Sequence, residues 1–225
     1  DEESLERCGG DSLFVIIIQT EDVGGAPHSF LKIIEGEDAD LAWEVDLGEI
    51  TDSGRDEIKA SPVVVDLDFD GKQEIIVSYD LSGTFYVKAF SPELICSVTG
   101  WSPGGSHVTE LLWTYSDSTL MIGSDEGPYV GTTRGGHKPT TQPLLADLDL
   151  DGSAELVLSL IEKNSDEPVI LALDITGTSA TSLWEKTLDK GTHPSDPTFV
   201  QTDENTAFIL LTSVQSSTSA MWLWK

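Results

Sequence analysis

The chain has few cysteines, few basic residues and no long apolar run. Its two cysteines, Cys8 and Cys96, are too few for a disulfide-rich scaffold or for a zinc site built on cysteine. Whether they pair with each other stays open. The longest apolar run, Leu13 to Ile18, is far shorter than the roughly 20 residues of a membrane-spanning helix. We therefore expect no membrane insertion.

The shortage of basic residues excludes another class of partner. Only 12 residues are Lys or Arg, against 40 Asp or Glu, and the formal net charge is −28. Binding to nucleic acid needs clustered cations that replace the counterions of the phosphate backbone. Anionic membrane surfaces are disfavoured for the same reason. The chain also lacks a Gly-x-Ser-x-Gly elbow, a P-loop and a Gly-x-Gly-x-x-Gly motif, so we expect it not to be an enzyme.

Against these absences, the apolar fraction of 39% is high enough for a folded core. Two segments, Ser61–Val77 and Gln142–Leu158, repeat one pattern: a short apolar strand, an acidic turn with Gly, and a second apolar strand. Each is predicted to be a β-hairpin. Weaker copies of the same outline occupy residues 108–123 and 197–211.

The four copies predict the fold. They start near residues 62, 108, 143 and 197, which gives units of about 35 to 54 residues. A four-stranded propeller blade has a period of roughly 40–50 residues. We therefore predict an all-β protein: a β-propeller of four-stranded antiparallel blades over residues 12–225, after an N-terminal extension at 1–11. Predicted third and fourth strands lie at 30–36 and 41–44, at 84–90 and 94–96, and at 168–174 and 182–185.

The two ends of the chain supply incomplete blades. Residues 12–46 provide three strands without an acidic hairpin before them, and the last unit stops within a third strand. A propeller needs a closed ring. Either the N-terminal strands complete the last blade, or these four to five blades belong to a larger ring; we favour the second.

The two strong hairpins share the spacing Asp-x-Asp-x-Asp-Gly-x-x-Glu. Three carboxylates so close together repel one another without a cation. Calcium accepts six to eight oxygen ligands in a flexible geometry, whereas magnesium demands a stricter octahedron. Gly71 and Gly152 stand where the chain must turn sharply, with an expected positive φ. The backbone carbonyls of Lys72 and Ser153 would add ligands, and we predict two Ca²⁺ sites.

The flanking strands and the acid at the ninth position distinguish these loops from an EF-hand. The hairpins resemble the calcium loops of FG-GAP repeats, found in integrin α-subunit propellers and in secreted microbial proteins. The resemblance implies two sets of ligands: Asp66, Asp68, Asp70 and Glu74, and Asp147, Asp149, Asp151 and Glu155. The phrase Ala172–Gly177, followed by Leu183–Glu185, also resembles the repeat of quinoprotein-like propellers.

The expected function follows from closed, structural metal sites. We expect a non-enzymatic, extracellular or cell-surface module, stabilised by calcium, for adhesion, surface assembly or protein–protein interaction. Its partner would be a protein or a glycan surface, or the rest of a longer chain or assembly. The alternatives are a fragment of a quinoprotein-like oxidoreductase and a carbohydrate-binding propeller. Secretion is inferred from the calcium supply and from the acidity.

Two further sets of residues are candidates for binding. His107, His137 and His193 occupy similar positions before three units and would meet on one face of a ring, although polar loop residues are the more ordinary reading. Trp101 stands in a Gly/Pro-rich loop and could stack against a ligand. The hairpin turns at 115–118 and 202–205 lack the triple Asp and the Gly and are predicted to form without metal.

Overall fold

The fold is all-β, as predicted: the described part of the chain contains strands in antiparallel sheets and no helix. A computed structural model describes residues 14–35, 41–51, 61–71, 73–91, 110–122, 142–165, 167–188, 193–194, 197–203, 206–215 and 218–224. None of these segments forms an apolar helix of membrane-spanning length. Cys8, Cys96, Lys72, Trp101, His107 and His137 lie outside the described residues, so the predictions that involve them stay predictions.

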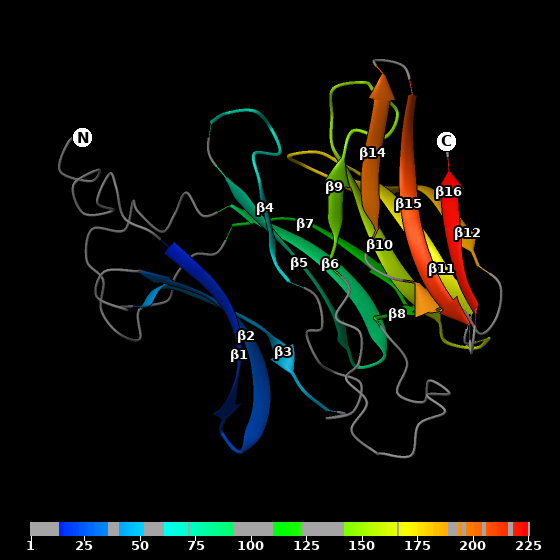
Figure 1. Cartoon of the computed structure of the whole chain (residues 1–225). Helices are drawn as coiled ribbons and strands as arrows, with labels where there is room; N and C mark the ends of the chain where they lie inside the picture. The colour runs from blue at the N-terminus through cyan, green and yellow to red at the C-terminus, as the bar shows by residue number, and fades with distance from the viewer. Residues whose placement is uncertain are drawn as a thin grey trace.

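The described strands form four sheets that follow one another along the chain (Figure 1). The first sheet contains β1 (Phe14–Val23), β2 (Ala26–Glu35) and β3 (Leu41–Glu49). The second contains β4 (Val63–Val65), β5 (Glu74–Leu81), β6 (Thr84–Ser91) and β7 (Glu110–Asp117). The third contains β8 (Leu120–Met121), β9 (Leu144–Ala146), β10 (Glu155–Glu162), β11 (Glu167–Ile175) and β12 (Ala180–Thr187). The fourth contains β13 (His193–Pro194), β14 (Thr198–Asp203), β15 (Thr206–Gln215) and β16 (Thr218–Trp224).

Short turns with positive φ connect the long strands. Gly24 and Gly25, between β1 and β2, have φ values of 66° and 96°, and Ser82 and Gly83, between β5 and β6, have 48° and 72°. Two consecutive residues with positive φ match the right-handed twist of the strands that they join. These turns fix the register of each hairpin, and therefore which side chains face the neighbouring sheet.

The sheets pack face to face in chain order, and the middle sheets are buried on both faces. On β10, Leu156, Leu158 and Leu160 lie in the core shared with the second sheet, whereas Val157 faces the core that contains Ile209 of the fourth. Alternate side chains of a strand point to opposite faces, so a strand between two sheets must be apolar along its length. This explains why β5 and β10 carry apolar residues at successive positions, Ile75–Val77 and Leu156–Leu158.

The junction between the second and third sheets is the largest described core. It contains Phe85 and Val87 from β6, Trp113 from β7, and Leu171 and Leu173 from β11 among its members. Phe85 is fully buried. The first and second sheets meet over a second core, where Trp43 and Phe90 pack edge to face with ring centroids 5.9 Å apart. Aromatic pairs in this geometry add to the stabilisation from buried area.

The chain between the second and third sheets differs from the prediction. The sequence predicted a hairpin over 108–123, but β7 pairs with β6 as the edge strand of the second sheet, and β8 pairs with β10 of the third. The hairpin prediction was therefore wrong, and β4 and β9 begin consecutive sheets. An apolar strand that contains Trp can be either the first strand of a new hairpin or the edge strand of the preceding sheet. The sequence pattern could not distinguish these two positions. The predicted strand at 94–96 lies outside the described residues.

The crossing strand β8 is held by a lysine from the third sheet. The Lys163 backbone N–H donates to Thr119 O at 2.9 Å, and its Nζ donates to Ser118 O at 3.0 Å and to Gly83 O. The Asp80 Oδ2 of β5 accepts the Ile122 N–H at 2.8 Å, directly after β8. Backbone pairing and these bonds tie the second and third sheets together.

The other predicted strands are borne out. The hairpin predicted near 197 is β14 paired with β15, and the third and fourth strands predicted at 30–36, 41–44, 84–90, 168–174 and 182–185 coincide with β2, β3, β6, β11 and β12. The second sheet has the predicted four antiparallel strands. Among the described strands, β1–β3 pair with none of β13–β16, so the N-terminal strands do not complete the last sheet there.

Replacing Phe85 with Ala tests the core between the second and third sheets. Removing this fully buried ring should lower the free energy of unfolding by about 3–5 kcal/mol, because it leaves a cavity between two sheets. Val64→Ala is the control, since Val64 is 47% exposed and its loss should change stability by less than about 0.5 kcal/mol. Urea unfolding of both variants measures the difference; equal stabilities would contradict this packing.

Candidate metal centres

The first acidic loop connects β4 to β5 and is wound around the carboxylate of Asp66. Asp66 Oδ1 accepts the N–H of Asp70 at 3.1 Å, and its Oδ2 accepts the N–H of Gly71 at 3.0 Å. Asp68 Oδ1 accepts the same Asp70 N–H at 3.2 Å. Side chains of Asp at such positions stabilise tight turns by bonding the backbone ahead of them. The loop is therefore curled so that its carboxylates face one another.

The second loop, between β9 and β10, repeats this arrangement atom for atom. Asp147 accepts the N–H groups of Asp151 and Gly152, each at 3.0 Å, and Asp149 Oδ1 accepts the Asp151 N–H at 3.2 Å. The second loop has one further bond, from the Ser153 N–H to Asp151 Oδ1 at 2.7 Å. The same sequence pattern thus produces the same loop in two sheets.

Two positions in each loop have positive φ. Gly71 and Gly152 have φ values of 89° and 97°, as the sequence predicted. The residue at the fourth position also has positive φ, 59° at Phe69 and 64° at Leu150, which the sequence analysis missed. A residue with a large side chain is uncommon in this conformation. The hydrogen bond from the third Asp N–H back to the first Asp closes a tight turn around this residue. In the sequence, only the repeat of the nine-residue pattern marked the position.

The glutamates at the ninth position lie beneath the loops. Glu74 is 4% exposed and Glu155 is 2% exposed. Glu74 Oε2 accepts the N–H of Leu67 at 2.7 Å, and Glu155 Oε2 accepts that of Leu148 at 2.5 Å. Each glutamate therefore fastens the second residue of its loop to the start of the following strand. This is a structural role in addition to the metal ligation predicted for both.

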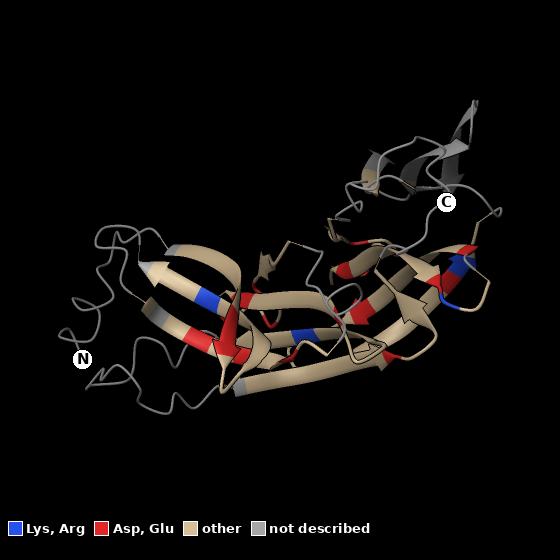
Figure 2. Ribbon diagram, turned by 90° about the horizontal axis from the view of Figure 1, so that it is seen from below, with Lys and Arg blue, Asp and Glu red and all other residues tan. Residues whose placement is uncertain are grey.

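The environment of these glutamates disfavours a negative charge. Burial raises the pKa of Glu155 to about 7, and the carboxylates of Asp149, Asp147 and Asp151 add to the increase, while the Leu148 N–H opposes it. Burial also raises the pKa of Glu74, with smaller contributions from Asp68, Asp70 and Asp66. The ion pairs of His28 and Lys32 lie on the first sheet. Figure 2 shows how few basic residues accompany the acidic ones.

The oxygen atoms converge closely enough to surround one cation in each loop. One carboxylate oxygen from each of Asp66, Asp68 and Asp70 lies within 4.8 Å of the others. In the second loop the converging set is Asp147, Asp149 and Glu155. Oxygens on opposite sides of a calcium ion are separated by roughly 4.6–5.2 Å, twice the metal–oxygen distance. Each loop thus brings together three predicted side chains, and the oxygen-only donor set fits a hard cation.

The fourth predicted side chain differs between the loops. Glu74 is absent from the first converging set, and Asp151 is absent from the second. Both remain close by, since Glu74 bonds Leu67 within the loop and Asp151 accepts from Ser153. Ligation by the carbonyls of Ser153 and Lys72 stays a prediction, and Lys72 lies outside the described residues.

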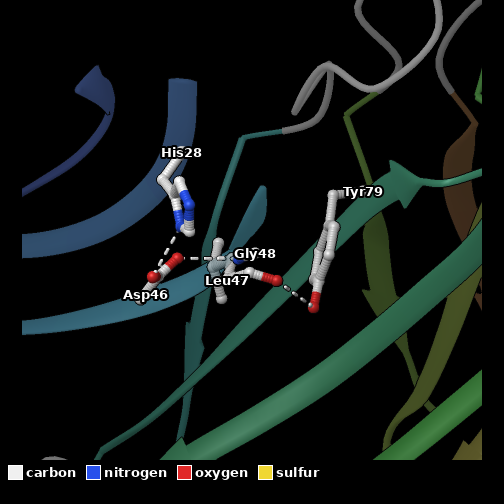
Figure 3. Close-up of polar contacts among 5 residues, drawn as sticks. All are labelled: His28, Asp46, Leu47, Gly48 and Tyr79. Carbon is white, nitrogen blue, oxygen red and sulfur yellow. Dashed lines mark hydrogen bonds and ion pairs between the residues drawn. The ribbon is translucent and has the colours of Figure 1, made fainter. Parts of the chain in front are cut away.

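A histidine that the sequence analysis did not single out forms a polar contact away from the loops. His28 Nδ1 lies 2.7 Å from Asp46 Oδ2, and Asp46 Oδ1 accepts the Gly48 N–H at 2.8 Å (Figure 3). One residue along β3, Leu47 O accepts the hydroxyl of Tyr79 from β5 at 3.5 Å (Figure 3). The contact joins strands of the first sheet, and no sequence motif marked it. His193 lies in β13, and the predicted histidine site stays a prediction.

Comparisons of the chain with protein-family models, with curated proteins and with solved structures found no match. The assignment of these loops therefore depends on their own geometry and donor chemistry.

The raised pKa of Glu155 predicts how the metal-free protein responds to pH. The folded state retains the proton up to about pH 7, whereas glutamate in the unfolded chain loses it near pH 4.3. The folded state binds more protons between these values, so the free energy of unfolding should fall as pH rises from about 4.5 to 7. Urea unfolding in the presence of a chelator measures this slope.

Glu155→Gln should reduce that slope, because the amide cannot ionise. Glu185→Gln is the matched control, since Glu185 is exposed on β12 and the variant carries the same change in net charge. A slope in Glu155→Gln as steep as in the control would contradict the predicted titration.

Proposed function

We propose that this chain is a non-enzymatic, calcium-stabilised β-propeller module that acts outside the cell in adhesion, surface assembly or protein–protein interaction. One observation carries the proposal: two consecutive sheets begin with the same oxygen-lined loop, wound by the same hydrogen bonds. The resemblance of these loops to FG-GAP calcium loops supports it. Each ion would be held mainly by the aspartates of its loop, with Glu155 joining them in the second.

The arrangement of the sheets supports a propeller. Antiparallel sheets stack face to face in chain order, with one core between each neighbouring pair. The second and third sheets each contain a strand of three residues, β4 or β9, that pairs with the start of the following long strand. Propeller blades are four-stranded antiparallel sheets arranged around a central channel. The remainder of a ring would come from the assembly or from a longer chain.

Calcium would stabilise the module rather than perform chemistry. A cation removes the repulsion among the aspartates and gives the buried glutamate an opposite charge. Extracellular calcium sites have dissociation constants of about 10⁻⁴–10⁻³ M. At ten times that concentration each site adds about 1.4 kcal/mol, and two sites about 3 kcal/mol. Against a total stability of roughly 5–15 kcal/mol, this contribution is large.

The melting temperature in calcium and in chelator tests this proposal. Calcium at ten times the dissociation constant should raise the melting temperature by roughly 6–12 °C, given 2–4 °C per kcal/mol for a domain of this size. Asp66→Asn and Asp147→Asn should each remove about half of the increase, and the double variant nearly all of it. Asp203→Asn, in a hairpin turn without the motif, is the control. A melting temperature that calcium does not change would contradict the proposal.

A further inference from the structure

A pocket lies between the two acidic loops, where the second and third sheets meet. Its walls are Val65, Asp66, Leu67 and Phe69 of the first loop, and Asp147 and the residues 152–154 of the second. Ile175 and Thr176, at the end of β11, complete it. Figure 1 shows the turns after β4 and β9 at the same end of their sheets. The floor is apolar and the rim is acidic.

The third sheet holds the two walls in place. The turn after β11 packs against the first loop so closely that a Cβ on Gly177 would lie 2.8 Å from the Cβ of Asp68. The Trp113 indole N–H of the second sheet donates to Thr176 O at 2.8 Å. Only glycine fits at 177, and the contact leaves little room for the loops to slide. The pocket is therefore a fixed feature of the junction between the sheets.

Phe69 lines this pocket and is largely exposed to solvent. Its side chain is 72% exposed, more than any other large apolar residue described, and it takes part in no described ring contact. Its counterpart in the second loop, Leu150, is half-buried. A largely solvated phenyl ring buries little apolar surface within the fold. Exposed aromatic residues beside pockets are common anchors for partner side chains.

The charge of the rim remains negative when calcium is bound. Each loop has four carboxylates and the first also contains Lys72, so one divalent cation leaves a formal charge of about −1 on the first loop and about −2 on the second when all are ionised. No lysine or arginine lines the pocket among the described residues. The whole chain carries −28, so the surrounding potential is also negative. A neutral ligand gains nothing from this field, and an anion is repelled.

We propose that this pocket receives an arginine or lysine side chain from a basic segment of a partner protein. The aliphatic stem packs on Val65, Leu67 and Ile175, while the cation lies over the ring of Phe69, near Asp66 and Asp147. Long basic side chains combine an apolar stem with a charged head, and cations bind the faces of aromatic rings. The inference rests on the proposed role as an interaction module and specifies the chemistry of its partner.

Fluorescence anisotropy with a labelled peptide tests the inference in saturating calcium. The probe is a short peptide, acetylated and amidated, with two arginines, and the comparison is the same peptide with citrulline at both positions. Saturable binding should need arginine and should weaken with added salt. Phe69→Leu should weaken it about tenfold through loss of the cation–ring contact. Leu is the suitable replacement because Leu150 adopts the same backbone conformation, with φ 64°.

Leu183→Ala is the matched control, because it removes an exposed apolar side chain, 41% accessible, on β12 and away from the pocket. It should bind the arginine peptide as the unchanged protein does. Equal binding of the two peptides, equal binding by Phe69→Leu, or no binding at all would overturn the inference. Binding of a neutral oligosaccharide through Phe69 in place of the peptide would overturn it as well.

The same samples separate this inference from the proposed function. Their melting temperatures in calcium and in chelator report on the metal sites alone. A calcium-dependent increase without peptide binding rejects the pocket and retains the calcium-stabilised module. Arginine-dependent binding without any effect of calcium on the melting temperature retains the pocket and rejects the calcium-stabilised module.

Discussion

The burial of both faces of each middle sheet is the constraint on which the rest of the structure depends. β5 and β10 each contribute alternate side chains to two different cores, so neither sheet is stable without neighbours on both sides. Stacking in chain order satisfies this requirement with short connections. It also places the turn after the first strand of the second and third sheets at a common end, where the acidic loops lie side by side around one pocket.

Without a cation, the acidic loops bring carboxylates close together against their mutual repulsion. Their hydrogen bonds hold carboxylates close together, and the glutamates beneath them are buried where ionisation is disfavoured. The fold can retain such loops because the flanking strands are fixed by the cores on either side. A cation would turn the same loops from a source of repulsion into a connection between the first and second strands of a sheet. Each acidic loop thus affects both the stability of its sheet and the charge of the protein surface.

The sequence predicted features that depend on local repetition and missed those that depend on tertiary pairing. The two strong hairpins, their glycines with positive φ and the position of most strands follow from alternation and spacing. The role of β7 and β8 does not, because an apolar strand before a polar turn looks the same whether it starts a hairpin or crosses between sheets. The pocket beside Phe69 was also beyond prediction, since it requires two loops and the turn before Gly177 to meet.

The crossing of β8 into the third sheet has a consequence for the modularity of the fold. In a simple array of blades, each sheet is one continuous stretch of chain and can be removed or exchanged as a unit. Here the third sheet borrows Leu120 and Met121 from the chain that has just left the second, and Lys163 fastens that crossing. A boundary placed after β8 would separate β8 from its partner β10, whereas one placed between β7 and β8 leaves both sheets with their own strands. Exchange of one sheet at that boundary would still have to supply partners for Asp80, which accepts the Ile122 N–H, and for Lys163, which donates to Gly83 O.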